Sequence, residues 1–210
     1  KSPFVLTAIN DKNIKSLKDI ERYKITLGQF AIKNPAILAM LQSQNIDIKS
    51  LKIKKQNFYN DIHQKGVFAF YLSNEIFTLK KQHIPYKVFN PQNYGINFYG
   101  DILFTSQKTF NNNPAQVAKV IKATKEGYIY AFQHVDETIR TILEKYNTQN
   151  LSYEKLKYEV NILKLMLSEN FRFNKFKIEN IENVYLLLRL VKNKLDSSKF
   201  TYSKFKLTLK

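Results

Sequence analysis

Residues 67–90 read VFAFYLSNEIFTLKKQHIPYKVFN, and within this one stretch the pattern changes from strand to helix and back. The apolar run 67–72 follows Gly66 and is typical of a buried strand. A helix is predicted over 75–82 and a second strand over 86–89. The stretch therefore predicts a strand, helix and strand unit of an α/β protein.

The residues before this stretch continue the same alternation. Strands are predicted over 3–9, 23–27 and 52–54, and helical segments over 16–20, 35–46 and 57–64. Asn34 followed by Pro35 is a helix-start signal, with Asn at the cap and Pro at the first helical position. Ser16 is expected to cap the short helical turn that follows it. The alternation predicts a mainly parallel sheet with helices on both faces.

The second half of the chain is expected to be mostly helical. After a strand over 98–105, helices are predicted over 114–134, 136–146, 152–168 and 181–194, and a last strand over 200–209. Asn113 and Pro114 repeat the capping pattern of Asn34 and Pro35. This half is expected to supply cover for the sheet.

The composition is that of a globular chain: 210 residues, 44% of them hydrophobic and 14% aromatic. The apolar runs fall short of the ~18–20 residues that a membrane-spanning helix needs. The opening residues do not resemble a signal peptide, so we expect a cytosolic or an already processed form. The chain has no cysteine, which excludes disulfides and thiolate metal ligands and leaves the compartment open.

The formal net charge of +17 raises the possibility of a nucleic-acid partner. Only four of the 34 basic residues are arginine, however, whereas base-reading proteins favour the bidentate guanidinium group. The lysines are scattered among many Asn, Ile, Phe and Tyr residues, which share AT-rich codons. We therefore favour a solvated lysine surface over a nucleic-acid interface and expect no nucleic-acid partner.

The sequence contains no convincing catalytic or metal motif. His63, His83 and His134 have no second ligand at metal-binding spacing, and we interpret them as surface or loop residues. Gly95 and Gly100 have the spacing of a phosphate loop, but an aspartate stands where the lysine of that loop is required. No Gly-x-Ser-x-Gly motif is present. We expect no catalytic residue, no metal and no cofactor.

The candidate binding residues follow, or border, predicted strands, where α/β proteins bind ligands. They are Tyr71, Asn74, Glu75, Tyr99 and Asp101. The tyrosines offer flat apolar faces, and the other three side chains offer hydrogen bonds to a ring nitrogen or an amino group. The combination suits a small, planar, polar ligand. The alternative is that these residues only form caps and turns, with Ser73 or Asn74 capping the next helix.

Three stretches run in an unusual order: YLSNE at 71–75, Lys80 with IPY at 84–86, and NYGINFYGDILFTS at 93–106. Weaker signals come from SPFVL at 2–6, Asn113-Pro114, GYIYA at 127–131 and EKYNTQN at 144–150. Together they resemble the thiamine-pyrimidine-precursor-type periplasmic binding domains. These domains are related to the sulfonate, taurine and nitrate binding proteins of ABC transporters. Similar domains form the sensory input regions of bacterial kinases and diguanylate cyclases.

The resemblance implies an α/β fold of the two-lobe, type II periplasmic-binding-protein kind, with the first lobe incomplete and a helix-rich C-terminal half. Residues 1–26 would belong to lobe one, 27–97 would form lobe two, and 98–210 would contain a crossing strand and helices packed on lobe one. Ligand contacts would come from Tyr71, Asn74 and Glu75, from the crossing residues Tyr99, Gly100 and Asp101, and from Gln29 and Asn34 in a further loop.

The function implied is non-catalytic binding of a small organic ligand in a cleft between the lobes, in the periplasm or another extracytoplasmic space. The ligand would be thiamine-pyrimidine-like, a sulfonate or similar. The partner would be an ABC permease or a fused signalling domain, and a membrane would be reached only through a flanking segment. Two alternatives remain: an enzyme of thiamine-pyrimidine biosynthesis, and a lysine-rich binder of nucleic acid or anionic surfaces.

Overall fold

The computed structural model describes residues 1–57, 62–167 and 173–196. The chain divides into two compact units. The sheet unit comprises residues 1–100 and 174–199, and the helical unit comprises residues 101–173 and 200–210. The expected lobe boundaries at residues 26 and 97 stay a prediction.

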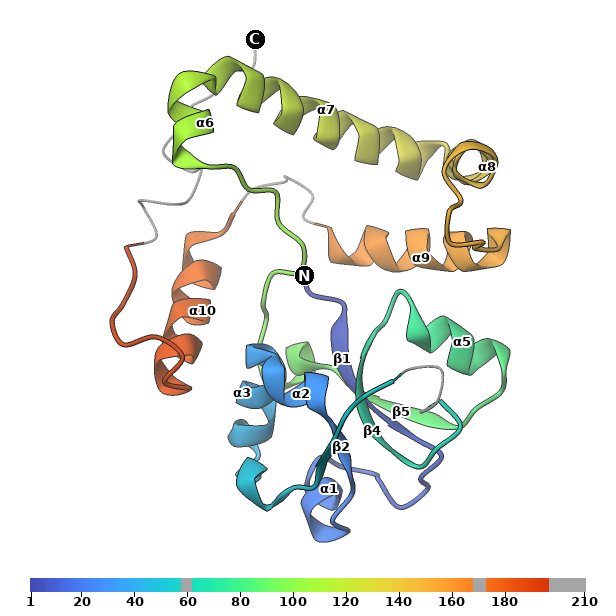
Figure 1. The fold of residues 1–210 in the computed structure, drawn as a ribbon, viewed down its shortest axis with the longest axis vertical. Coiled ribbons are helices and arrows are strands. Elements are labelled where there is room, and N and C mark those ends of the chain that lie inside the picture. Colours follow the sequence, from blue (N-terminus) through green and yellow to red (C-terminus); the bar gives the residue numbers. More distant parts are fainter. Residues whose placement is uncertain (58–61, 168–172, 197–210) are drawn as a thin grey trace. The chain divides into compact units, whose positions relative to one another are not determined.

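A five-stranded sheet in the order β3-β2-β4-β1-β5 forms the centre of the sheet unit (Figure 1). The strands are β1 Phe4–Ile9, β2 Leu27–Gly28, β3 Ile53–Lys54, β4 Gly66–Tyr71 and β5 Tyr86–Phe89. β2 runs parallel to β3 and β4, whereas β1 runs antiparallel to both β4 and β5. Four of the five strands of this sheet therefore point the same way and β1 opposes them, so the prediction of a mainly parallel sheet is confirmed except for β1. Strand direction depends on non-local pairing, which the local hydrophobic pattern does not encode.

Helices cover both faces of this sheet, as predicted (Figure 1). On one face lie α1 Lys18–Arg22, α2 Gln29–Lys33 and α3 Pro35–Ser43, and on the other lies α5 Glu75–Lys81. Two 3₁₀ helices, η1 Ile48–Ser50 and η2 Pro91–Tyr94, lie in the connections. α10, Lys175–Leu187, packs against α3. It begins earlier than the predicted helix at 181–194.

The core follows the two-residue period of the central strands. Leu6 of β1 and Ala69 of β4 point to the face that α1, α2 and α3 cover, where they meet Leu41. Phe68 and Phe70 of β4 point to the opposite face and pack with the buried residues of α5. This alternation buries both sides of β4, which explains why its sequence reads as an uninterrupted apolar run.

The local capping predictions had mixed outcomes. The Asn34 side chain accepts hydrogen bonds from the backbone N–H groups of Ala36 and Ile37, at 3.0 and 3.2 Å, so this cap is confirmed. Ser16 does not cap α1, whose N-cap is Leu17. Asn113 occupies the N-cap of the following helix but makes no capping hydrogen bond with its side chain. A cap needs both the residue type and the right backbone angle, and only the residue type is visible in the sequence.

Of three other predictions, one is contradicted by the structure and two fall on residues outside the described part of the chain. Residues 98–105 contain no strand, because no neighbouring strand within the described residues pairs with them. The helix predicted over 57–64 falls largely on residues 58–61, which lie outside the described part of the chain. The strand predicted over 200–209 lies entirely outside it.

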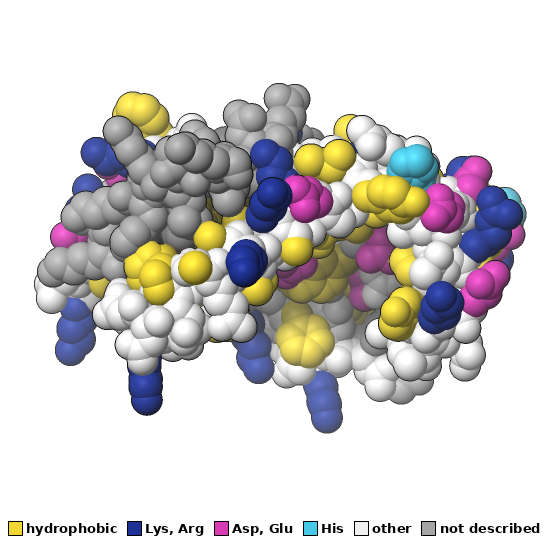
Figure 2. Space-filling model, turned by 90° about the horizontal axis from the view of Figure 1, so that it is seen from above, with side chains coloured by type: hydrophobic (Ala, Val, Ile, Leu, Met, Phe, Trp, Pro, Cys, Tyr) yellow, Lys and Arg dark blue, Asp and Glu magenta, His cyan; other side chains and the backbone are white. Residues whose placement is uncertain are grey.

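The helical unit contains α6 Gln107–Asn112, α7 Pro114–Gln133, α8 Val135–Lys145 and α9 Tyr153–Met166. α8 and α9 pack together, and the Tyr153 hydroxyl donates a hydrogen bond to Asp136 across this contact. Ala118, Ile139 and Leu156 are the buried apolar residues among the described part of this unit. In the view onto α6, α7 and α8, exposed apolar side chains lie among lysine and acidic side chains (Figure 2). The unit therefore has a small core of its own.

Thr7 is a fully buried residue in the middle of β1, and its hydroxyl oxygen has no hydrogen-bond partner among the described residues. We expect Thr7→Val to raise the free energy of unfolding by about 1 kcal/mol, because it removes an unpaired buried hydroxyl at nearly constant shape. Urea titration would measure the gain. Thr148→Val, at an exposed position, is the control and should change stability little. A loss of stability in Thr7→Val would show that the hydroxyl is hydrogen-bonded after all.

Candidate functional site

The candidate residues gather at the end of the sheet where β4 finishes and β1 begins. β1 and β4 are antiparallel, with Phe4 opposite Tyr71, so the start of one strand lies beside the end of the other. β2 runs parallel to β4 and also ends on this side, where α2 begins at Gln29. The N–H of Leu72 donates to the carbonyl of Pro3 at 2.9 Å and extends the contact beyond the strands.

Tyr71 is the most exposed aromatic side chain of this group. Its side chain is 44% exposed although it follows five buried residues of β4. The ring packs edge-on against Phe4 with the ring centroids 4.9 Å apart. The ring is thus held by the protein on one side and stays partly exposed.

Glu75 closes the turn that links β4 to α5. Its Oε2 accepts a hydrogen bond from the backbone N–H of Tyr71 at 2.7 Å, and its Oε1 accepts one from the Asn74 amide at 3.3 Å. Asn74 is the N-cap residue of α5 but forms no capping bond with its side chain, and Ser73 is buried. The carboxylate therefore holds the turn, and Asn74, one of the two residues named as a possible cap, occupies the N-cap position without a capping bond from its side chain.

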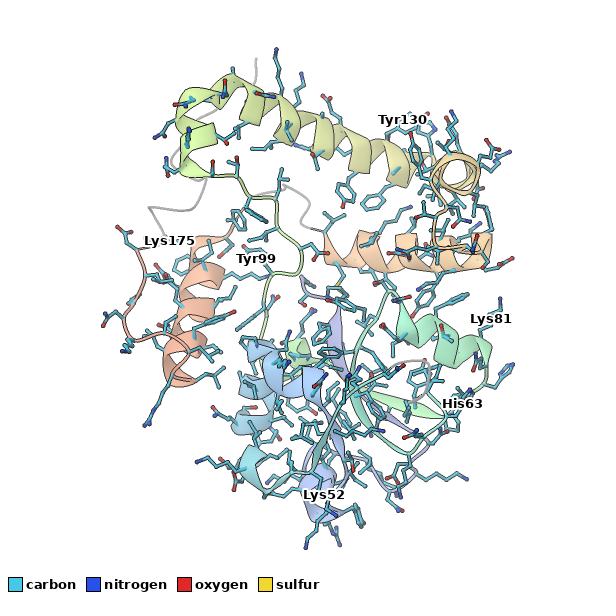
Figure 3. All side chains as sticks on the ribbon, in the orientation of Figure 1. Lys52, His63, Lys81, Tyr99, Tyr130 and Lys175 are labelled. Carbon is cyan, nitrogen blue, oxygen red and sulfur yellow. The ribbon has the colours of Figure 1, made fainter. Side chains whose placement is uncertain are left out.

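Tyr99 lies on the segment that returns beside the first residues of the chain. The N–H of Ser2 donates to the carbonyl of Phe98 at 3.0 Å, which brings this segment next to the start of β1. The hydroxyl oxygen of Tyr99 accepts a hydrogen bond from the N–H of Asn174, the N-cap of α10, at 2.7 Å. Figure 3 shows Tyr99 on the segment facing the beginning of α10.

A lysine of α10 covers the ring of Tyr99. The ammonium nitrogen of Lys177 lies 4.0 Å from the ring centroid, which is close for a cation–π contact. Burial lowers the pKa of Lys177 below its ordinary value. α10 therefore brings a positive charge to this end of the sheet, and sequence reasoning had not included Lys177 among the candidates.

The remaining candidates are placed less centrally. A Cβ atom on Gly100 would lie 3.1 Å from the carbonyl oxygen of Lys1, so the two chain segments approach closely there. The side-chain oxygen of Asn34 accepts the capping hydrogen bonds of α3, and Gln29 is the first residue of α2. Asp101 is exposed and begins the helical unit, so the structure does not group it with the others.

Gln56 is a further polar residue near this end of the sheet that sequence reasoning missed. Its amide nitrogen donates to the carbonyl of Ala69 at 2.7 Å, and its amide oxygen accepts from the N–H of Ala69 at 3.3 Å. Gln56 thereby pairs with β4 where the short strand β2 has already ended at Gly28. The sequence carried no signal for this side chain, because a strand was predicted over 23–27 and the two-residue length of β2 emerges only from the structure.

Two further properties concern only the residues that the structure describes. No group of three His, Cys, Asp or Glu side chains in this part of the chain could hold a metal ion. None of the helices there is both long and apolar enough to cross a membrane.

The fold is similar to that of periplasmic binding proteins of known structure. The chain aligns with the aliphatic sulphonate binding protein SsuA from Escherichia coli at a TM-score of 0.70 and 12% identity, covering 95% of this chain and 65% of that one. It aligns with the sulfonate-binding protein SsuA from Methylobacillus flagellatus KT at a TM-score of 0.59 and 12% identity, covering 94% of this chain and 62% of that one. With the alkanesulfonate-binding protein SsuA from Xanthomonas axonopodis pv. citri bound to MOPS, the TM-score is 0.65 and the identity 10%. That alignment covers 94% of this chain and 68% of the other. The chain thus spans about two thirds of the length of these proteins.

These likenesses confirm the predicted class, the α/β fold of periplasmic binding proteins with a helix-rich C-terminal half. Residues 1–138 match the family described as NMT1/THI5 like. The chain belongs to this family, as the resemblance of its motifs predicted. No curated protein matches it in a sequence comparison.

Proposed function

We propose that this chain binds a small organic ligand without catalysing a reaction, at the end of the sheet where β4 finishes. The supporting observation is that Tyr71 and Glu75, which share one turn, come to this end together with Tyr99 from a later segment of the chain. The carboxyl ends of parallel strands are the usual ligand sites of α/β folds. β2 and β4 both end there.

The chemistry of this end favours a compact ligand that combines an apolar or aromatic part with charged or polar groups. Tyr71 offers an exposed ring surface, and the Glu75 carboxylate still has acceptor positions beyond its two internal hydrogen bonds. Lys177 adds a positive charge over the ring of Tyr99. Thiamine-pyrimidine-like bases and sulfonates with an amino group both satisfy this description.

The biological role we propose is that of a solute-binding component of an ABC transporter or of an extracytoplasmic sensor domain fused to a signalling protein. Membership of the NMT1/THI5 like family and the fold of periplasmic sulfonate-binding proteins support solute binding. The same evidence supports a location outside the cytoplasm. Whether transport or signalling follows from binding depends on the partner of the chain.

A thermal-shift screen tests the proposal, because a ligand stabilises the state to which it binds. The purified chain is screened with thiamine pyrimidines, alkylsulfonates, taurine, nitrate and purine bases. We expect at least one class to raise the melting temperature by several degrees and Tyr71→Ala to abolish that shift. Tyr146→Ala, which removes a tyrosine side chain 68% exposed in the helical unit, is the matched control and should retain it. An equal shift in both variants would contradict the proposed site.

Glu75 needs a separate variant because its carboxylate also supports the turn. Glu75→Gln retains an amide oxygen as acceptor for the Tyr71 N–H and removes the negative charge. A ligand that binds through a positively charged amino group should lose affinity in this variant. A ligand that is uncharged and only accepts hydrogen bonds should not. Product formation, or a purified chain that carries a cofactor absorbing in the visible range, would favour the biosynthetic enzyme over a binding protein.

A further inference from the structure

A surface of lysine side chains surrounds α1 and η1 at the end of the sheet where β2, β3 and β4 begin. This lysine patch consists of Lys15, Lys18, Lys24, Lys49, Lys52 and the aromatic residue Tyr23, all exposed. Lys24 and Lys52 come just before β2 and β3, and the carbonyl of Lys52 accepts from the N–H of Leu27 at 2.8 Å. The Glu21 carboxylate links α1 to η1 by accepting from the N–H of Asp47 at 3.2 Å. The segments that carry these lysines therefore lie next to one another, and Figure 3 labels Lys52 among them.

The acidic side chains of this region bond to neighbouring backbone groups. Asp19 accepts from the backbone N–H groups of Lys15 and Ser16, at 3.0 and 2.7 Å, and these hydrogen bonds hold its pKa below the usual value. Asp47 accepts from the N–H of Lys49 at 3.0 Å. Across the described ranges, none of the five lysines of the patch forms an ion pair. Their charges are therefore directed to solvent.

Apolar surface lies among these charges. Tyr23 is 45% exposed, and the Arg22 guanidinium lies 5.4 Å from the centre of its ring. Ile53, on the edge strand β3 next to Lys52, is also exposed. Lysines surrounding an exposed tyrosine and an aliphatic side chain are typical of surfaces that lie at the headgroup level of a bilayer.

From these observations we propose that the lysine patch docks this chain on an anionic lipid surface. Lysine ammonium groups are compact point charges that suit a layer of mobile headgroups, and they lack the bidentate fork that favours fixed phosphate geometry. Tyr23 and Ile53 would enter the interface between the headgroups. The docking needs no membrane-spanning segment.

The patch and the candidate ligand site lie at opposite ends of the sheet. β4 is six residues long, begins at Gly66 on the patch side and ends at Tyr71, which separates the two ends by about 16 Å. A chain docked through the patch keeps its ligand-binding end directed away from the lipid. The inference is independent of the proposed function, because it rests on a different surface.

Vesicle flotation tests the proposal with the full chain and two lipid compositions. We expect binding to vesicles of phosphatidylcholine with 30% phosphatidylglycerol at low salt, and little binding to phosphatidylcholine alone. The double variant Lys24→Glu/Lys52→Glu should weaken binding to the anionic vesicles about tenfold or more. Lys108→Glu/Lys119→Glu removes the same charge from exposed lysines of the helical unit and should weaken it far less.

Tyr23→Ser tests the contribution of the apolar side chain to vesicle binding separately from the contribution of the lysine charges. It should weaken binding to anionic vesicles while leaving the salt dependence unchanged. The proposal is overturned if the two double variants lose equal affinity, because net charge alone would then explain binding. It is also overturned if the chain ignores the anionic vesicles, or if it binds random DNA more tightly than these vesicles through the same lysines.

Discussion

Phe68→Ala is expected to lower the free energy of unfolding by about 3–5 kcal/mol, the range found when a large aromatic residue is removed from a packed core. Phe68 is fully buried on the α5 face of β4, and its ring stacks on Phe70 at a centroid distance of 5.9 Å. The ammonium nitrogen of Lys54 lies 4.7 Å from the centroid of the Phe68 ring. The ring also covers Gly28 and Gly66, which have no side chains that could fill the space left behind. The loss should therefore lie near the upper end of the range. Urea unfolding would measure it.

Gly66 provides a specific test of this packing. A Cβ atom on Gly66 would lie 2.8 Å from two ring atoms of Phe68 and 3.6 Å from the carbonyl oxygen of Thr26. Gly66→Ala should destabilise the wild-type chain by roughly 1–3 kcal/mol through overpacking, but should cost little once Phe68 is alanine. Phe104→Ala, at a side chain 87% exposed, is the control for loss of a phenyl ring. Additive effects of the two core substitutions would contradict the contact.

Local signals in the sequence predicted the elements that depend on near neighbours. The start of α3 follows from Asn34 and Pro35, because both the cap and its acceptors lie within three residues. The end of β4 and the start of α5 follow from the change of period after Tyr71. The motifs around these residues also indicated the family, which residues 1–138 confirm.

Features that depend on distant parts of the chain were not predictable in the same way. The antiparallel direction of β1 is set by its pairing with β4, about sixty residues later. Residues 98–105 have the composition of a strand, yet a strand also needs a partner at its edge, and none lies beside them within the described residues. The bond between Tyr99 and Asn174 joins residues 75 positions apart.

The candidate site shows the same division. The presence of Tyr71, Asn74 and Glu75 at the end of a strand could be predicted from the sequence, because all three lie in one turn. The hydrogen bonds of Glu75 to the turn itself could not, since they depend on backbone angles. Lys177 was missed because nothing in its local sequence indicates that α10 lies over Tyr99.

Gln56→Ala is expected to cost about 2–4 kcal/mol, although it removes a single uncharged side chain. The substitution leaves both the N–H and the carbonyl of Ala69 without their partner inside the sheet, and each unpaired buried group costs about 1–3 kcal/mol. Gln116→Ala, an exposed glutamine of α7, is the control and should change stability by less than about 0.5 kcal/mol. Thermal and urea unfolding would both report the difference.

Gly28 determines whether Gln56 can reach its position. A Cβ atom on Gly28 would overlap the amide oxygen of Gln56 and would lie 3.0 Å from the ring of Phe68. Gly28→Ala should therefore displace Gln56 and produce most of the loss seen in Gln56→Ala, and the two changes together should cost much less than their sum. Strictly additive losses would mean that Gln56 keeps its bonds to Ala69 beside the new methyl group. A glutamine that takes the place of a strand residue here then requires a glycine beside it, and Gly28 meets that requirement.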